Sequence, residues 1–353
     1  MSEPRMSQKK PSYPISNLLE DYLNRYNRYM KIPISYEDLE RFSGSVSVYN
    51  QKEEDTLWIR VFYAEHERSE IDMNLKKVYT LFHSDGSEAP LPYLNVDAID
   101  YCTFGNSKPF RIKIRNILND NFVYFYVKKA DASRIYGLAL EHMLSPDNLN
   151  FLVYKNTLIE EHIAGIPGDE FIQHFLPKCL ESEKAQITKE FVKFNERCMI
   201  RLLGDMRAYN YVIVPTHDFD QVIYKIRAID FDQQSFESNL KIYRPQFFKE
   251  NYKMVELVKN KLNKASINQY KIEERSIIAK RLISSGDRIE RLMNAMISDH
   301  LAPPKNIDIL KNQVYQLTLD RNFLACNTMG QIVQAGFDFV KRNYESHEAL
   351  GIH

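Results

Sequence analysis

The sequence has little of what marks several common protein classes. Its 353 residues include only 4 cysteines, which are dispersed without a C-x-x-C pair, so it indicates neither a zinc site nor a disulfide framework. The 47 Lys and Arg balance the 47 Asp and Glu, which gives no general attraction to nucleic-acid phosphates. The sequence lacks both the ~20-residue apolar run that spans a bilayer and the apolar core of a secretory signal. We therefore expect a cytoplasmic protein with no membrane insertion and no nucleic-acid partner.

At about 150 residues per domain, the length predicts roughly two folded units. We expect a disordered tail over residues 1–14, followed by an extension over 15–100 that joins a β-rich segment over 101–165. The remaining segment, 166–353, is dominated by helical patterns.

Strand patterns are frequent in the first half of the chain. Residues 77–83 resemble a strand that ends at a turn, and isoleucines alternate with basic residues over 110–117. With 121–129, the latter predicts two adjacent antiparallel strands. A helix is expected to begin near Ser133, and two further strands lie within 149–165.

The second half predicts a helix over 184–204 and then a hairpin, whose strands are 209–215 and 221–232. From Phe247 onward the pattern is helical again. The expected fold class is therefore α+β, with a mixed sheet early in the chain and helices late.

Chemistry-bearing residues gather at both ends of this hairpin. The segment LGDMRAYN (203–210) precedes it, and IDFD (229–232) closes it. Phosphoryl transfer needs a carboxylate to orient or deprotonate the acceptor, and oxygen ligands to hold magnesium across the nucleotide phosphates. Asp205, Asn210 and Asp230 would supply these groups.

An Asp with an Asn five residues later, followed by a hairpin that ends in an apolar-Asp-Phe triplet, resembles the catalytic and metal-binding loops of the protein kinase-like superfamily. The Leu-Gly-Asp opening is closest in style to aminoglycoside and choline phosphotransferases and to HipA-like kinases. The resemblance implies a two-lobed protein kinase-like fold, with an antiparallel β-rich N-lobe and a mainly helical C-lobe that carries the catalytic hairpin 203–232. It also implies ATP- and Mg²⁺-dependent phosphotransfer to a hydroxyl acceptor.

The resemblance assigns roles around the hairpin. Asp205 would be the base or acceptor-orienting group, and Arg207 would contact the transferred phosphate. Asn210 and Asp230 would hold magnesium, with Asp232 as an additional ligand.

It also assigns nucleotide-binding roles upstream. Lys128 resembles the strand lysine that holds the α- and β-phosphates, with Lys129 as its rival, and Glu141 would position that lysine. Backbone groups from about Glu161 to Ile163 would meet adenine in a hinge between the lobes.

Two departures from the family pattern leave alternatives open. The expected glycine-rich loop is replaced by FGNSKP (104–109), which has one glycine, and no Ala-Pro-Glu element follows Asp230. One alternative is a pseudokinase scaffold that binds nucleotide weakly or not at all, and another is nucleotidyl transfer to a protein. The acceptor, a small molecule or a protein hydroxyl, is also open.

A basic helical stretch over 259–281 is most simply a solvated helix face, the alternative being contact with a phosphate-rich partner.

Overall fold

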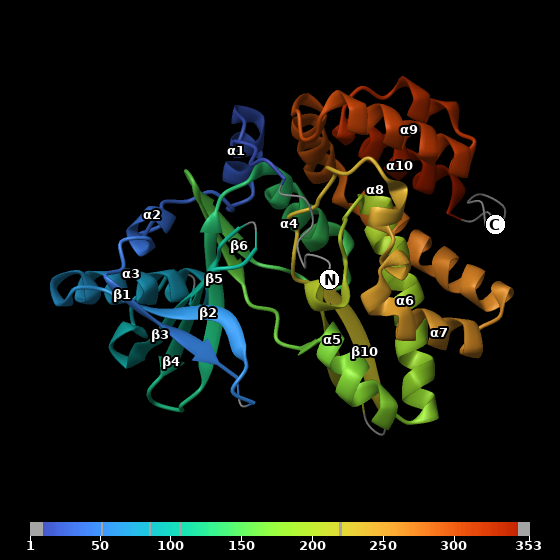
Figure 1. The fold of residues 1–353 in the computed structure, drawn as a ribbon. Coiled ribbons are helices and arrows are strands. Elements are labelled where there is room, and N and C mark those ends of the chain that lie inside the picture. The colour runs from blue at the N-terminus through green and yellow to red at the C-terminus, as the bar shows by residue number, and fades with distance from the viewer. Residues whose placement is uncertain (1–9, 51, 85, 106, 219–220, 345–353) are drawn as a thin grey trace. The chain divides into compact units, whose positions relative to one another are not determined.

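The computed structural model describes residues 10–50, 52–84, 86–105, 107–218 and 221–344 (Figure 1). These fall into two compact units. The first takes the chain up to Asp131 together with Leu149–His162, and the second takes Ala132–Asn148 together with the chain from Ile163 onward. The first unit is sheet-based and the second is mainly helical, which confirms the α+β class.

The first unit is built on a seven-stranded antiparallel sheet of order β1-β2-β3-β4-β5-β7-β6 (Figure 1). Its strands are β1 (Gly44–Tyr49), β2 (Asp55–Phe62), β3 (Leu94–Cys102), β4 (Phe110–Asn116), β5 (Phe122–Lys129), β6 (Phe151–Tyr154) and β7 (Thr157–Glu161). The antiparallel pair expected over 110–117 and 121–129 is confirmed as β4 and β5.

The sheet of the first unit has one apolar face and one mixed face. In β4, Phe110, Ile112 and Ile114 are buried in the core, whereas Arg111 and Lys113 are only partly buried. This alternation follows from the period of two in a β-strand. The sequence pattern therefore identified the core face of β4 correctly.

Helix α3 (Glu65–His83) replaces the strand that we expected over 77–83. Ile71, Leu75 and Val78 are all buried in the core of the first unit. Their spacing of four and three residues forms one face of a helix. The expected strand is wrong because seven residues were too short a window to show that Val78 continues a helical stripe.

Three shorter helices complete the first unit: α1 (Asn17–Arg25), α2 (Tyr36–Leu39) and the 3₁₀ turn η1 (Leu91–Tyr93). Residues 1–9 of the expected tail lie outside the described residues. Lys10 and Tyr13, which also belong to that tail, bond to the carboxylate of Asp131 at 2.8 and 2.9 Å.

The second unit surrounds α6 and α8 with further helices and a three-stranded sheet of order β10-β9-β8. Its longer helices are α4 (Ala132–Leu144), α6 (Glu181–Arg201), α7 (Tyr252–Lys261), α8 (Lys264–Ser298), α9 (Pro304–Thr318) and α10 (Met329–Asn343). Its strands are β8 (Ile166–Pro167), β9 (Tyr211–Asp218) and β10 (Gln221–Ala228). The hairpin β9–β10 confirms the one expected from the sequence.

Short helical turns connect these elements. They are α5 (Gly168–Glu170), the π-helical turn η2 (Phe171–Phe175), and the 3₁₀ turns η3 (Leu176–Lys178), η4 (Ala208–Asn210), η5 (Leu240–Tyr243), η6 (Pro245–Phe247), η7 (Lys249–Asn251) and η8 (Arg321–Ala325). Helix α8 is interrupted at Gly286, where φ is 42° and ψ is −122°.

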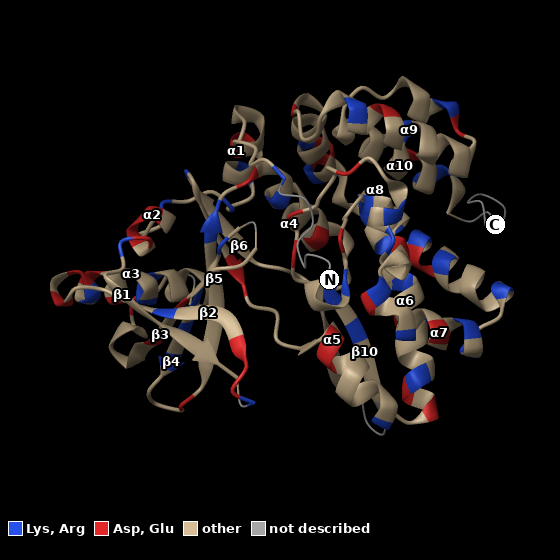
Figure 2. Ribbon diagram, viewed as in Figure 1, with Lys and Arg blue, Asp and Glu red and all other residues tan. Residues whose placement is uncertain are grey.

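Figure 2 shows Lys and Arg interspersed with Asp and Glu along the helices of the second unit. Among the described residues, no helix combines the length and the apolar character that a membrane span requires.

Candidate phosphotransfer site

The segment that follows α6 is held on both sides by backbone hydrogen bonds. Leu202 takes the left-handed conformation, with φ 52°, and ends the helix. The N–H of Gly204 then donates to the carbonyl oxygen of Gln233 at 3.1 Å, and the N–H of Asp205 donates to that of Ile242 at 3.0 Å. These bonds tie the 203–205 segment to two later parts of the chain.

Asn251 provides a second attachment for this loop. Its Nδ2 donates to the carbonyl oxygens of Met206 and Pro245 at 2.9 and 2.8 Å, and its Oδ1 accepts from the hydroxyl of Tyr211 at 2.8 Å. The Asn251 residue is fully buried, so these bonds satisfy groups that water cannot reach. The loop that carries Asp205 is therefore positioned by tertiary contacts on both sides.

The structure brings Asp205 and Asn210 together through a direct hydrogen bond. Nδ2 of Asn210 donates to the carbonyl oxygen of Asp205 at 2.7 Å. Asp205 has φ 58°, a left-handed conformation that Asp tolerates better than most residues. Its residue exposure is only 8%, and one carboxylate oxygen accepts from Nε of Arg207 at 2.8 Å.

Arg207 lies between two carboxylates. In addition to Asp205, its Nη1 contacts Glu250 at 2.9 Å, and its guanidinium lies 5.1 Å from the ring centroid of Phe248. Burial acts to lower the pKa of Arg207, but the hydrogen bond to Asp205 and the nearby negative charge raise the pKa above its ordinary value. The guanidinium is thus a permanent cation beside the Asp205 carboxylate.

The register of the hairpin places Ile229, the residue before Asp230, opposite Asn210. Tyr211 pairs with Ala228, and the N–H of Ile229 donates to the carbonyl oxygen of Asn210 at 3.1 Å. Asp230 is the next residue. The two oxygen-bearing side chains expected to share a metal therefore come from the same end of one hairpin.

Asp230 and Asp232 have different surroundings. Asp230 is partly exposed, and its Oδ1 accepts from the N–H of Asp232 at 2.9 Å. Asp232 is buried and forms an ion pair with Arg134 of α4. The side-chain amide of the neighbouring Gln233 is also buried, and neither its nitrogen nor its oxygen has a hydrogen-bond partner among the described residues.

The oxygen ligands that Asn210 and Asp230 offer suit a magnesium ion more than a metal ion whose ligands all come from the protein. Among the described residues, no group of three or more His, Cys, Asp or Glu side chains could hold a metal ion. A magnesium ion is commonly held by one or two carboxylates plus phosphate oxygens and water. Because Nδ2 of Asn210 donates to the carbonyl oxygen of Asp205, its amide oxygen is left for a cation.

Lys128 and Lys129 have different environments in the first unit. The Nζ of Lys128 lies 2.7 Å from Glu160 of β7, and the two side chains are 8% and 5% exposed. Lys129 has a side chain that is 54% exposed and lies 3.3 Å from Glu40. Of the two rivals, Lys128 has the buried, paired position.

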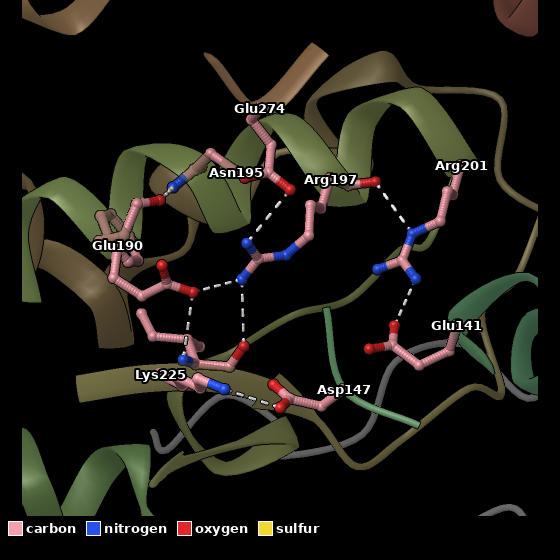
Figure 3. A network of polar contacts seen from close by, with 10 residues as sticks. Glu141, Asp147, Glu190, Asn195, Arg197, Arg201, Lys225 and Glu274 are labelled. Atoms are coloured by element: carbon pink, nitrogen blue, oxygen red, sulfur yellow. Dashed lines mark hydrogen bonds and ion pairs between the residues drawn. The ribbon is translucent and has the colours of Figure 1, made fainter. Parts of the chain in front are cut away.

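Glu141 belongs to the second unit, where it forms a buried ion pair with Arg201 of α6 (Figure 3). The same network includes Arg197, which lies 2.5 Å from Glu190 and 3.3 Å from Glu274. Burial acts to raise the pKa of Glu141, but the charge of Arg201 outweighs it and holds the pKa below its ordinary value.

The positioning of a lysine by Glu141, which the resemblance implies, stays a prediction. Lys128 has Glu160, and Glu141 has Arg201, each within its own unit.

The two residues expected in the hinge fall on either side of the division between the units. Glu161 ends β7, and its backbone N–H donates to the carbonyl oxygen of Asn150 at 3.0 Å. Ile163 begins the second unit's main segment and is buried. Their contact with adenine stays a prediction.

The expected phosphate loop connects β3 and β4. Gly105 has φ 97°, and Lys108 has φ 39°. The carbonyl oxygen of Lys108 accepts from the hydroxyl of Tyr36 at 2.8 Å, which attaches this end of the loop to α2.

Sequence reasoning missed several partners of the candidate residues. Glu250 lies 43 positions from Arg207, Glu160 lies 32 from Lys128, and Arg201 lies 60 from Glu141. No local spacing signals such contacts, because tertiary packing brings them together.

In comparisons with known proteins, no protein-family model and no curated protein matches the chain. The functional argument therefore depends on the geometry of the site.

Proposed function

We propose that the chain is an ATP- and Mg²⁺-dependent phosphotransferase with a protein kinase-like, two-lobed fold and a hydroxyl acceptor. The observation that carries the proposal is the arrangement of Asp205, Asn210 and Asp230. The Asn210 side chain bonds to the Asp205 backbone, and the Asn210 backbone bonds to the residue before Asp230. A carboxylate and a pair of oxygen ligands at one end of a hairpin suit phosphoryl transfer.

In this proposal, the carboxylate of Asp205 orients the acceptor hydroxyl and accepts its proton. Arg207, held beside that carboxylate, provides positive charge for the transferred phosphoryl group. Asn210 and Asp230 would hold Mg²⁺, which when bound supplies charge neutralisation for the nucleotide phosphates. Asp232 would be an additional ligand only in competition with its ion pair to Arg134.

In the first unit, Lys128 is the proposed contact for the nucleotide phosphates. Its ammonium is a buried point charge that Glu160 keeps in place. The positioning role of Glu141 that the resemblance implies is kept as a proposal, beside the ion pair with Arg201 that joins α4 to α6. Adenine contacts are proposed at the backbone of Glu161 and Ile163.

Thermal unfolding with and without Mg²⁺ and ATP tests the nucleotide site. A ligand that binds only the folded state raises the apparent stability. We expect Tm of the wild type to rise with Mg-ATP and the rise to be lost in Asp230→Ala. The matched control is Asp308→Ala, which removes a carboxylate that is 65% exposed on α9 and should keep the full response.

No rise for the wild type at millimolar Mg-ATP would contradict the proposal. An equal rise for wild type and Asp230→Ala would contradict the assignment of Asp230.

The second candidate function is a pseudokinase scaffold. The single glycine in the 104–109 loop and the engagement of Arg207 by two carboxylates both favour it. Release of ADP over time, lost in Asp205→Asn, separates an enzyme from a scaffold. The mass added to the acceptor, phosphate or AMP, separates phosphoryl transfer from nucleotidyl transfer, and candidate acceptors should include both small molecules and protein hydroxyls.

A further inference from the structure

A small pocket with several charged lining side chains lies in the second unit, and none of its lining residues is one of the candidate phosphotransfer residues. Its volume is about 20 Å³, which is room for about one water-sized group. Four of its lining side chains are charged: Glu196 of α6, Arg244 after η5, and Lys271 and Arg275 of α8.

The pocket has more positive than negative charge. Nε of Arg275 lies 2.5 Å from Glu196, so these two buried side chains neutralise each other. Lys271 and Arg244 form no ion pair, and their side chains donate no hydrogen bond, to any residue in the described part of the chain. The guanidinium of Arg244 lies 5.0 Å from the ring centroid of Phe247. Three cations therefore share one carboxylate in this pocket, which leaves an excess of two positive charges.

The pKa values of Lys271 and Arg244 reflect the free-energy cost of holding their positive charges in the pocket. Burial lowers the pKa of Lys271; Glu196 opposes this, and the positive charges of Arg275 and Arg244 add to the lowering. Burial also lowers the pKa of Arg244, again opposed by Glu196. Partly buried cations without a counter-ion destabilise the folded state, so a bound anion would relieve a cost that the empty pocket carries.

We propose that this pocket binds a phosphate group, either free or as the terminal group of a small molecule. A phosphate at neutral pH carries a charge of about −1.5 to −2, which balances the excess of two positive charges in the pocket. Guanidinium groups fit phosphate oxygens well, and ammonium groups bind them as point charges. The small volume of the pocket favours a terminal phosphate over a whole nucleotide.

Two residues of the basic stretch 259–281 line this pocket. Most of the basic side chains there have no place in the pocket, but Lys271 and Arg275 line it. None of the charged lining residues belongs to the candidate phosphotransfer site, so a failure of one proposal leaves the other standing.

Calorimetric titration of the full chain tests the proposal, with inorganic phosphate in one arm and glycerol 3-phosphate in the other. The buffer contains no phosphate, and sodium chloride keeps the ionic strength constant. We expect the wild type to bind, and Lys271→Gln and Arg244→Gln each to bind at least about tenfold more weakly, since each loses a charged hydrogen bond. Equal affinities in the two arms assign the site to the phosphate group alone, and tighter binding of the ester assigns it to a phosphorylated small molecule.

Thermal unfolding without phosphate gives a second readout that a merely structural role would not produce. Both variants are expected to unfold at a higher Tm than the wild type, because each removes an uncompensated cation. The matched control is Lys280→Gln, an exposed lysine of the same helix outside the pocket, which should leave binding unchanged. A wild type that does not bind millimolar phosphate, or an equal loss of binding in Lys280→Gln, would overturn the proposal.

Discussion

Replacing Arg201 with methionine is expected to cost about 3–5 kcal/mol of unfolding free energy, because it leaves a carboxylate buried without its cation. The side chains of Arg201 and Glu141 are 2% and 3% exposed and form an ion pair. Arg201 also donates through Nε to the carbonyl oxygen of Arg197 at 3.2 Å. The substitution removes both interactions, while Glu141 stays in a site that solvent cannot reach.

Urea unfolding followed by two probes measures this cost. Far-UV circular dichroism follows the helices, most of which belong to the second unit. The fluorescence of Trp58, the only tryptophan, follows the first unit. Two probes are needed because a protein of two units need not unfold in one step. We expect the dichroism transition to move to lower urea in the variant.

The control and the double variant decide whether the ion pair is the cause. Arg291→Met breaks a pair of 2.7 Å whose side chains are 45% and 57% exposed, and it should cost less than about 1 kcal/mol. The double variant Glu141→Met/Arg201→Met should be less destabilised than Arg201→Met alone, since no charge is left unpaired. A cost below about 1 kcal/mol for Arg201→Met, or additive costs in the double variant, would refute the reasoning.

The pH dependence gives an independent check. The folded protein holds the pKa of Glu141 below its ordinary value. Such a carboxyl contributes stability above its unfolded pKa of about 4.3, and this contribution is lost as pH falls through the lower folded pKa. In Arg201→Met the same carboxyl takes up a proton readily. The stability gap between wild type and variant should therefore be largest near neutral pH and shrink below about pH 4.

Three further predictions concern the candidate site. Burial raises the pKa of Glu237, and the charge of Asp205 adds to the rise. The contribution of this carboxyl to stability is therefore complete below its unfolded pKa and is lost as pH rises through its folded pKa. We expect Glu237→Gln to raise Tm at pH 7 but not below about pH 4. Gly204→Ala would place a Cβ 2.9 Å from the carbonyl oxygen of Gln233 and should lower the unfolding free energy by about 1–3 kcal/mol, as measured in thermal melts. Gly44→Ala is the control, because a Cβ there would have no atom within 4 Å. Gln233→Met removes a buried amide without a partner and should leave stability unchanged or raise it by up to about 3 kcal/mol; a clear loss in urea unfolding would show that the amide has a role that its contacts do not reveal.

The parts of the fold that local rules govern were predictable. Ser16 stands just before the helical pattern of α1, where serine is a preferred N-cap, and its side chain accepts from the N–H of Leu19 at 3.3 Å. Ile112 and Ile114 alternate with basic residues and face the core. These features depend on neighbours within a few positions, which the sequence displays directly.

The strand expected over 77–83 shows where local reasoning was insufficient. A short run with alternating apolar residues fits either a strand or part of a helix. Ile71 and Leu75, which precede the run, decide the matter because they extend one buried helical face.

For the candidate site, the sequence by itself determined which chemical groups are present and that Asp205, Asn210 and Asp230 flank one hairpin. It did not determine how the buried charges pair. Lys128 with Glu160 and Glu141 with Arg201 are pairs that only the tertiary structure decided. The physical reason is that a buried charge must find an opposite charge among the side chains packed around it. Which side chains those are depends on how the elements pack, across 32 and 60 positions of chain.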